Sequence, residues 1–381
     1  MASSEPGLLL SDLHPAPLNS RGAKEIESCA DGNRQRTGQA GILAPRKCGL
    51  EGDYGMTDIL LTGAGGQVGS EIGRRGRHAG LTVCALDHLG LDITDRDAIR
   101  AIVDGIQPRI VVNAAAYTAV DRAESDRAAA FAINRTGPSF LAEACAKANI
   151  PIVHLSTDYV FDGRKNGAYH EADPTAPLGI YGASKLAGEE AVRSLTQRHI
   201  ILRTSWVYGV YGHNFVKTML RLAETRDSID VVDDQSGCPT FAGDLAAAVL
   251  QIARAMIAST PDSIGYGTFH CAGAGETTWC GFAHEIFELA GLVLTKTPTV
   301  KRICTAQFPT AARRPQNSVL DCGRLDAVHG IRLRPWRLGL KEMLQTVLGS
   351  SSYNVVNRGF VRTRSQCGDT ADPSVGAVQV A

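Results

Sequence analysis

A glycine-spaced turn near residue 63 lies between a strand-like run and a helix-like run. Residues 57–62 form a short apolar run, as expected for a strand buried in a parallel sheet, and residues 70–79 are expected to be helical. Glycines at positions 63, 66 and 69 permit a tight turn and let backbone N–H groups approach a pyrophosphate at the helix N-terminus. A glycine triplet alone is weak, but a strand before it and a helix after it favour a dinucleotide-binding turn.

An acidic residue ends the next apolar run, 81–86. Asp87 lies 24 residues beyond Gly63, where a carboxylate can accept hydrogen bonds from the adenosine ribose. His88 and Leu89 follow, so no arginine stands ready for a 2′-phosphate, which tilts the prediction towards NADH. The alternative for Asp87 is a solvated acid at the end of a strand. Slightly later in the chain, Asp92-Ile93 could flank the adenine.

Strand-like and helix-like segments alternate along most of the chain. The expected strands are 57–62, 81–86, 108–113, 151–155, the run from 199, and 268–270. The expected helices are 70–79, 96–106, 125–149, the helix of Tyr181, the helix from 214, 242–259 and 279–290. This alternation predicts an α/β fold of the Rossmann type, a doubly wound parallel sheet with a smaller C-terminal substrate-binding region.

The two ends of the chain differ from its centre. The first 55 residues are rich in Gly, Ser, Arg and Asp and show no sustained period, so they are expected to be disordered; alternatively, Met56 is the natural start. The expected division is an extension at 1–55, one folded domain at 56–348, in which 56–200 mainly bind the dinucleotide and 201–348 mainly bind substrate with returns to the sheet, and a disordered tail at 349–381.

A Tyr-x-x-x-Lys pattern indicates proton-transfer chemistry. Residues four apart share a helix face, so Lys185 lies beside Tyr181 and makes its phenol easier to deprotonate. A free phenol has a pKa of about 10, so proton exchange near neutrality needs such help. Thr157 follows the apolar run 151–155, and its hydroxyl could bind the same substrate oxygen. The alternative is a chance pairing, although among nine tyrosines only Tyr181 has a lysine four residues later.

Further candidates follow other strands, where open α/β sheets bind their ligands. The small residues at 114–116 leave space for a cofactor or simply permit close packing. Trp206 offers a flat ring that could pack on a sugar or in the core. Arg313 and Arg314 suit a pyrophosphate, or form a solvated surface pair.

Composition argues against several classes of function. Lysines and arginines number 39 and so do the acids, so the net charge of zero suggests no nucleic-acid or anionic-membrane partner. No apolar run is long enough to span a membrane, and no signal-peptide core is present. Ten cysteines without a Cys-x-x-Cys pair are typical of reduced thiols in a cytoplasmic protein. No Cys/His cluster supports a protein metal site.

Eight longer motifs carry a family resemblance. They are GAGGQVG (63–69), VVNAAAYTAVDRAE (111–124), STDYVFDG (156–163), YGASKLAGE (181–189), RTSWVYG (203–209), NFVKTMLRLA (214–223), DDQSGCPT (233–240) and ARRPQNSVL (312–320). Over roughly residues 57–348 the chain resembles the dTDP-4-dehydrorhamnose reductase family of extended short-chain dehydrogenases/reductases. The resemblance implies reduction of the C4 ketone of dTDP-4-dehydro-L-rhamnose by NADPH or NADH, in nucleotide-sugar biosynthesis for cell-surface polysaccharide.

The resemblance also implies a role for each matching position. Tyr181 would donate the proton, Lys185 would lower the pKa of Tyr181 and hold the nicotinamide ribose, and Thr157 would polarise the carbonyl. The implied cofactor-binding residues are Gly63, Gly66, Gln67, Val68, Gly69, Asp87, Asp92, Ile93, Ala116, Tyr117 and Thr118, with Tyr181 and Lys185. The implied substrate contacts are Thr157, Asp158, Val120 and Trp206. Tyr117 departs from the family, which often has histidine there, and this affects nucleotide preference more than chemistry.

Other interpretations stay open at this point. An epimerase or dehydratase for another sugar nucleotide would share the Tyr and Lys, although the Glu that dehydratases usually pair with Asp158 is replaced by Tyr159. A related regulatory subunit of methionine adenosyltransferase keeps the fold for partner binding alone. The family often binds Mg²⁺ at a subunit contact, so the resemblance also suggests Mg²⁺ and a homodimer, although the sequence shows no carboxylate cluster.

Overall fold

The computed structural model describes residues 56–260, 263–291 and 293–356. The extension expected at 1–55 and residues 357–381 of the expected tail therefore lie outside the described residues. The last helix, α11 (Trp336–Val356), continues past residue 348, where the folded domain was expected to end. In the described part of the chain, no helix combines the length and the apolar character needed to cross a bilayer.

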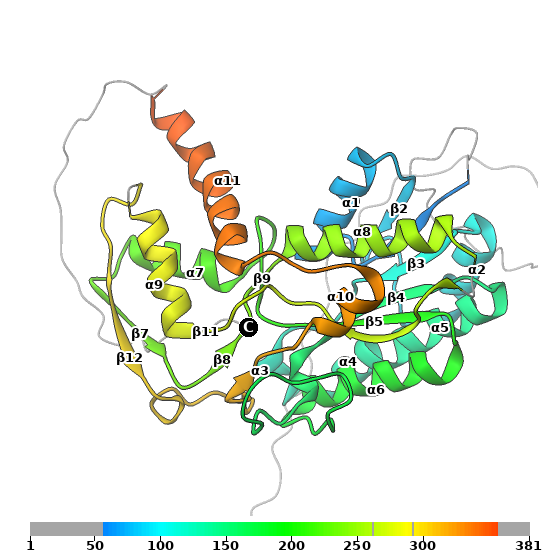
Figure 1. Ribbon diagram of the computed structural model, residues 1–381, viewed down its shortest axis with the longest axis horizontal. Coiled ribbons are helices and arrows are strands. Elements are labelled where there is room, and N and C mark those ends of the chain that lie inside the picture. The colour runs from blue at the N-terminus through cyan, green and yellow to red at the C-terminus, as the bar shows by residue number, and fades with distance from the viewer. Residues whose placement is uncertain (1–55, 261–262, 292, 357–381) are drawn as a thin grey trace, which may run out of the picture. The chain divides into compact units, whose positions relative to one another are not determined.

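Six parallel strands form the central sheet, in the order β10-β5-β4-β3-β1-β2 (Figure 1). The strands are β1 (Ile59–Thr62), β2 (Val83–Leu86), β3 (Ile110–Asn113), β4 (Ile152–Thr157), β5 (His199–Thr204) and β10 (Gly267–His270). The chain passes from β1 to β2 at one edge and then returns to the other side of β1 to build β3, β4 and β5. This reversal confirms the doubly wound Rossmann-type sheet that the alternating sequence predicted.

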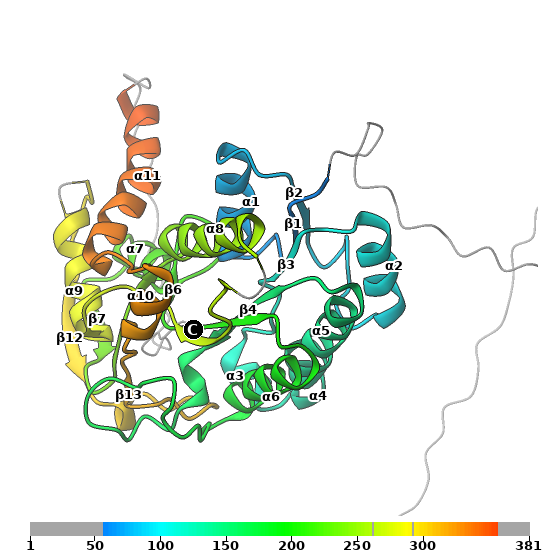
Figure 2. The same ribbon diagram turned by 45° about the vertical axis from the view of Figure 1, so that its right-hand side comes forward.

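Helices cover both faces of this sheet because successive strand residues face opposite sides. Ile59 and Leu61 of β1 belong to one apolar core, whereas Leu60 belongs to the other. The first core includes residues of α1 (Gln67–His78), α8 (Ala242–Ala258) and α10 (Gly323–His329). The second includes residues of α2 (Arg96–Ile106), α5 (Gly137–Ala148) and α6 (Ile180–Leu195). Figure 2 shows α1 and α8 on one side of the strands and α5 and α6 on the other.

The prediction of a single helix at 125–149 is wrong in one respect, because a π-helical turn interrupts the segment. The segment consists of α4 (Arg127–Phe131), the π turn Ala132–Thr136 and α5. Pro138 has no N–H, so it cannot donate the regular helical hydrogen bond to the carbonyl of Asn134. That carbonyl instead faces Gly188 of α6, where an added Cβ would approach it to 2.0 Å. The interruption therefore lets α6 pack closely on this segment.

The C-terminal part has a core of its own. Aromatic and aliphatic residues from helices α7, α9 and α11 pack there with strand β7, at the left of Figure 1. The elements of this region are α7 (Phe215–Ala223), β7 (Ser228–Val232), α9 (Trp279–Ala290) and β12 (Thr299–Ile303). The parallel pair of β7 and β12 was not expected from the sequence, because β12 is mostly exposed and carries Lys301 and Arg302. The division between dinucleotide-binding and substrate-binding parts at residue 200 stays a prediction.

Short pairings complete the C-terminal part. They join β6 (Val207–Tyr208) to β9 (Thr240–Phe241), and β8 (Ser236–Gly237) to β11 (Thr277–Thr278) and β13 (Asn317–Ser318). Because β6 follows β5 directly, these pairings hold the C-terminal loops beside the carboxyl edge of the large sheet.

Gly63 makes the closest approach between the turns that follow β1 and β3. Its φ is +73°, and a Cβ at this position would lie 2.4 Å from the nitrogen of Ala115. The second turn is itself fixed, because the Oδ1 of Asn113 accepts from the Thr62 hydroxyl and from the Ala115 N–H. Only glycine satisfies both the left-handed backbone and the missing space.

Replacing Gly63 by alanine should therefore lower the free energy of unfolding by at least about 2 kcal/mol, since strain and a backbone clash add together. Urea unfolding followed by circular dichroism measures this change. Gly105→Ala in α2 is the matched control, because a Cβ there meets nothing within 4 Å. That variant should gain up to about 1 kcal/mol from helix propensity. Equal stability of the two variants would contradict the proposed clash.

Candidate active site

The glycine turn lies at the point where the strand order reverses, between β1 and β3. Open α/β sheets bind ligands in this crevice, beyond the carboxyl ends of the strands. Helix α1 begins at Gln67 after Gly66, with no side chain capping its first turn. Gly65 and Gly66 are exposed. The free N–H groups of this helix N-terminus fit the diphosphate of a dinucleotide.

The predicted residues of the turn contribute in different ways. The side chain of Gln67 donates to the carbonyl of Val207 at 3.5 Å and accepts from Asn214 at 3.0 Å, so it ties the turn to the C-terminal part. Val68 packs against the apolar core. Gly69 lies so close to Gly63 that a Cβ added at Gly69 would be 2.1 Å from the Gly63 carbonyl oxygen. This turn therefore offers a diphosphate its backbone N–H groups rather than these side chains.

The predicted adenosine-binding residues lie after β2. Asp87 is exposed, and its Oδ1 accepts from the backbone N–H groups of Leu89 and Gly90, both at 3.0 Å. Asp92 is also exposed and accepts from the N–H and hydroxyl of Thr94. The side chain of Ile93, in contrast, is buried in the core, so only its backbone could face a ligand.

A buried asparagine, which the sequence analysis missed, joins the cofactor crevice to the Tyr181 helix. Asn134 accepts from the N–H of Tyr117 at 2.8 Å and donates to the Tyr117 carbonyl at 3.0 Å. It also donates to the hydroxyl of Ser184, which in turn donates to the carbonyl of Tyr181. Ala116 is partly buried and Thr118 exposed in the same turn. A polar residue four positions before a proline, inside an expected helix, was the only signal of this role.

Thr157 and Tyr181 meet at the carboxyl end of β4. Thr157 is the last residue of the strand, and Tyr181 lies in the first turn of α6. Burial raises the pKa of Tyr181 to about 12, and the Thr157 hydroxyl opposes this rise. The ring of Tyr159 packs edge-on against that of Tyr181, with centroids 5.4 Å apart. The phenol therefore stays protonated at neutral pH and can act as an acid.

Lys185 is almost completely buried one helical turn beyond Tyr181. Its Nζ donates to the carbonyl of Leu155 at 2.6 Å, and only 2% of the residue is exposed. Burial lowers the pKa of Lys185 to about 8, whereas the nearby Glu189 carboxylate opposes this change. The pKa of Tyr181 is affected by burial, by the Thr157 hydroxyl and by the Asp158 carboxylate. The expected lowering of the Tyr181 pKa by Lys185 therefore stays a prediction.

Glu189 is the centre of a buried ionic network beneath this helix face. Arg203 of β5 donates to both of its oxygens, at 2.9 and 2.8 Å. The hydroxyl of Ser156 and the guanidinium of Arg193 also donate to it, at 2.6 and 3.0 Å. These donors hold the pKa of Glu189 below its usual range despite complete burial.

Comparisons with known proteins identify the family. The family sequence model described as "RmlD substrate binding domain" matches residues 56–348. A dTDP-4-dehydrorhamnose reductase of Aggregatibacter actinomycetemcomitans is 45% identical over 294 residues, covering 76% of this chain and 98% of that protein. The enzyme of the same name from Escherichia coli K12 is 39% identical over 302 residues, covering 77% and 99%. The chain belongs to the dTDP-4-dehydrorhamnose reductase family.

Solved structures support the same assignment. The dTDP-4-dehydrorhamnose reductase of Clostridium acetobutylicum matches with a TM-score of 0.71 and 40% identity, over 76% of this chain and 99% of that one. The Bacillus anthracis reductase, solved in complex with NADP, matches with a TM-score of 0.71, 36% identity and the same coverage. The resemblance drawn from the sequence motifs is thus confirmed, while the homodimer and the cytoplasmic location stay predictions.

The substrate contacts expected from the reductase family differ in accessibility. Asp158 is 2% exposed, and its Oδ2 has no hydrogen-bond partner among the described residues. Val120 is buried at the start of α3 (Val120–Ala123). Trp206 has a positive φ of 47° and stacks on Trp279, with ring centroids 3.6 Å apart. One face of the Trp206 ring is therefore already covered, so stacking on a sugar is limited to what the other face exposes.

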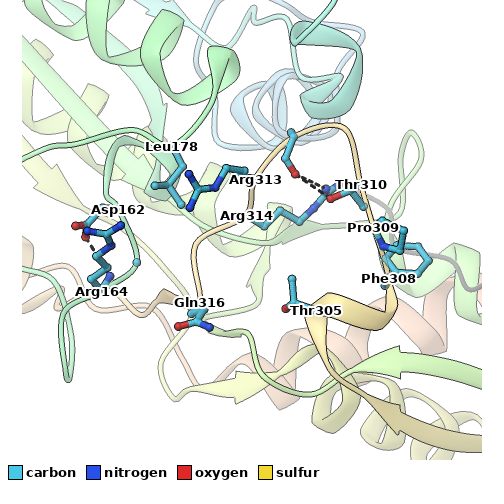
Figure 3. Close-up of a pocket in the computed structure, with 12 residues that line it drawn as sticks. Asp162, Arg164, Leu178, Thr305, Phe308, Pro309, Thr310, Arg313, Arg314 and Gln316 are labelled. Carbon is cyan, nitrogen blue, oxygen red and sulfur yellow. Dashed lines mark hydrogen bonds between the residues drawn. The ribbon is translucent and has the colours of Figure 1, made fainter.

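The adjacent arginines that could have formed a pair have separate environments. Arg314 is buried and donates two hydrogen bonds to Asp121, at 3.0 and 2.8 Å. Asp121 also accepts from the backbone N–H of Ala312. Arg313 is exposed and lines a cavity (Figure 3). The solvated surface pair is therefore wrong for Arg314, which is buried against Asp121, whereas pyrophosphate binding by the two arginines stays a prediction.

The described residues of this single chain show no site for the Mg²⁺ that the family resemblance suggested at a subunit contact. Across the described ranges, no three or more His, Cys, Asp or Glu side chains form a group that could hold a metal. The carboxylates of Glu71, Asp244 and Glu342 are linked instead by arginines. Arg75 bridges Glu71 and Glu342, and Arg334 bridges Asp244 and Glu342. The arginines occupy the positions around these carboxylates, and Mg²⁺ binding stays a prediction.

Replacing Glu189 by glutamine should lower the free energy of unfolding by about 3 kcal/mol, because it leaves the buried Arg203 charge without its partner. The matched control is Glu190→Gln, since Glu190 is exposed, and it should change stability by less than about 0.5 kcal/mol. Chemical denaturation of both variants measures the difference. Equal denaturation midpoints of the two variants would show that the buried pair of Glu189 and Arg203 contributes little to stability.

Proposed function

We propose that this protein reduces the C4 ketone of dTDP-4-dehydro-L-rhamnose to dTDP-L-rhamnose with NADPH or NADH. The single observation that carries the proposal is the partly buried phenol of Tyr181 beside Thr157, at the same carboxyl end of the sheet as the glycine turn. The carboxyl ends of β1, β3 and β4 lie along that edge because the strands are parallel neighbours. The relatives named as reductases of this ketosugar support the choice of substrate.

Tyr181 is the acid in the proposed reaction. When bound, the nicotinamide supplies the hydride that adds to the ketone carbon. The carbonyl oxygen then gains negative charge, and the phenol of Tyr181 donates its proton to that oxygen, which completes the alcohol. A pKa of about 12 keeps this proton in place before the reaction. The Thr157 hydroxyl lies adjacent to the phenol and donates to Asp158 in the free protein; by turning towards the substrate it can donate to the same oxygen and orient the ketone.

Lys185 contributes a positive charge in a nearly closed environment. The Leu155 carbonyl fixes its position, and below pH 8 its ammonium form predominates, because the pKa is lowered to about 8. A buried cation near the phenol stabilises developing phenolate as the proton leaves. The same ammonium can donate to the nicotinamide ribose, as the family resemblance implies.

Asp158 is the proposed contact to a sugar hydroxyl. Burial raises its pKa to about 6, so the carboxylate is ionised at neutral pH. Its Oδ1 accepts from Thr157 at 3.0 Å, and the Ser318 hydroxyl also acts on the carboxyl and opposes the rise of its pKa. Its Oδ2 has no partner of good geometry among the described residues, and a substrate hydroxyl could provide one. For the cofactor, exposed Asp87 can bind the ribose hydroxyls and would repel a 2′-phosphate, which favours NADH.

Replacing Tyr181 by phenylalanine should lower kcat by between about 100-fold and about 10,000-fold, because the proton donor is lost. Cofactor binding should be unchanged, since the glycine turn is intact. The assay follows the loss of NADPH or NADH absorbance with the ketosugar nucleotide. Tyr266→Phe is the control, because Tyr266 lies just before β10, at the amino ends of the parallel strands, whereas Tyr181 lies at their carboxyl ends. No turnover of the wild-type protein with either cofactor would contradict the function.

The rate should also depend on the charge of Lys185. Its folded-state pKa is lowered to about 8, so the cation is present below this pH and lost above it. We therefore expect kcat/KM for the cofactor to fall as pH rises through about 8, because kcat/KM reports groups of the free enzyme. The Lys185→Met variant should lack this limb. A flat wild-type profile between about pH 6.5 and about 9.5 would argue against a role for the cation.

A further inference from the structure

The helix that carries Tyr181 begins after a glycine, which has no side chain to cap it. Helix α6 starts at Ile180, directly after Gly179, and the N–H groups of a first helical turn need acceptors from outside the helix. The carboxylate of Glu124 supplies one, because its Oε1 accepts from the Ile180 N–H at 2.8 Å. We propose that Glu124 is a positioning residue, which fixes the first turn of α6 and thereby the phenol of Tyr181.

The contact between Glu124 and the start of α6 is closely fitted. A Cβ added at Gly179 would lie 2.5 Å from the Oε1 of Glu124. The φ of Gly179 is −143°, which any residue can adopt, so the backbone conformation does not require glycine. The space that the Glu124 carboxylate occupies does require it. The absent side chain of Gly179 thus makes room for a cap that comes from 55 positions earlier in the chain.

The backbone that carries Glu124 is itself held in place. Glu124 directly follows α3, which lies beside α6 (Figure 2). Ala123 is completely buried, and Asp121 of the same helix accepts from Arg314 of the late arginine loop (residues 312–316), at 3.0 and 2.8 Å. Glu124 is half-buried rather than free in solvent. The carboxylate therefore caps α6 from a fixed position.

Tyr181 is the residue directly after the capped one. Glu124 holds the peptide N–H of Ile180, and the hydroxyl of Ser184 donates to the carbonyl of Tyr181 at 2.8 Å. The backbone of Tyr181 is thus held on both sides. This matters for a proton donor, because a displacement of about 1 Å can lower a rate by about 100-fold. The inference rests on the proposed function, in which the Tyr181 phenol donates a proton to the substrate.

Glu124 acts through position rather than through its charge. The pKa of Tyr181 is affected by burial, by Thr157 and by Asp158, and Glu124 is not among these causes. A glutamine at position 124 would keep an oxygen that accepts from the Ile180 N–H and would lose the charge. Alanine would remove the acceptor altogether. These two substitutions therefore separate a cap from an electrostatic effect.

Replacing Glu124 by alanine should lower kcat about tenfold or more, because the first turn of α6 loses its cap. The KM values for cofactor and ketosugar nucleotide should stay close to those of the wild type, since Glu124 is not among the expected ligand contacts. Glu124→Gln should retain kcat within about threefold of the wild type. Gly179→Ala, which displaces the carboxylate and leaves Glu124 in the chain, should reproduce the loss. An unchanged kcat in Glu124→Ala would overturn the proposal.

A double-mutant cycle separates positioning from a general defect of the fold. In a Tyr181→Phe background, Glu124→Ala should change the residual rate by less than about twofold, because the phenol that it positions is absent. A general defect would lower the rate by the same factor in both backgrounds, and that result would overturn the proposal. The matched control is Asp95→Ala, which removes the carboxylate that caps α2. Its kcat at saturating cofactor should equal that of the wild type.

Hydrogen exchange separates this inference from the proposed function. Mass spectrometry of Glu124→Ala should show about fivefold faster exchange of the amides of residues 180–183 than in the wild type, with or without turnover. Unchanged exchange would overturn the cap. Faster exchange in a protein without any turnover would keep the cap but overturn the reductase function, and with it the positioning role. Normal turnover with an unchanged kcat in Glu124→Ala would overturn the positioning role alone.

Discussion

Burial of the Glu189 carboxylate fixes helix α6 on the central sheet. Glu189 has no exposed surface, and its hydrogen bonds run to Ser156 on β4 and Arg203 on β5. Removing such a charge from its partners is costly, so the helix has one stable register on these strands. Tyr181, Lys185 and Glu189 follow at intervals of four on one helix face. The ionic network therefore determines how far the phenol extends along the end of β4.

A second set of contacts places the cofactor crevice against this helix. Asn134 binds the backbone of Tyr117 and, through Ser184, the carbonyl of Tyr181. Its position depends on the π-helical turn, which exists because Pro138 cannot donate a regular hydrogen bond. Hydrogen bonds through Asn134 and Ser184 consequently join the turn after β3 to the first turn of α6. These bonds would fix the distance between the phenol and a nicotinamide bound as proposed.

Local sequence patterns were sufficient to predict the sheet and the proximity of Thr157 to Tyr181. Strand β3, helix α2 and helix α9 end at the residues where the apolar pattern of the sequence ends. The proximity of Thr157 and Tyr181 could be predicted because Thr157 ends a strand and Tyr181 begins a helix at the same end of the sheet. The residues that were missed depend on distant partners. Asp121 and Arg314 are 193 positions apart, and no local pattern indicates that one neutralises the other. The same holds for Trp206, whose ring face is covered by Trp279 from a different helix.

The late arginine loop shows how two neighbouring residues of one type can have different roles. Pro315 lies so close to Gly163 that a Cβ added at Gly163 would be 2.5 Å from the Cβ of the proline. The next residue back, Arg314, is held by its hydrogen bonds to Asp121. These contacts leave Arg313 on the cavity wall with a fixed backbone.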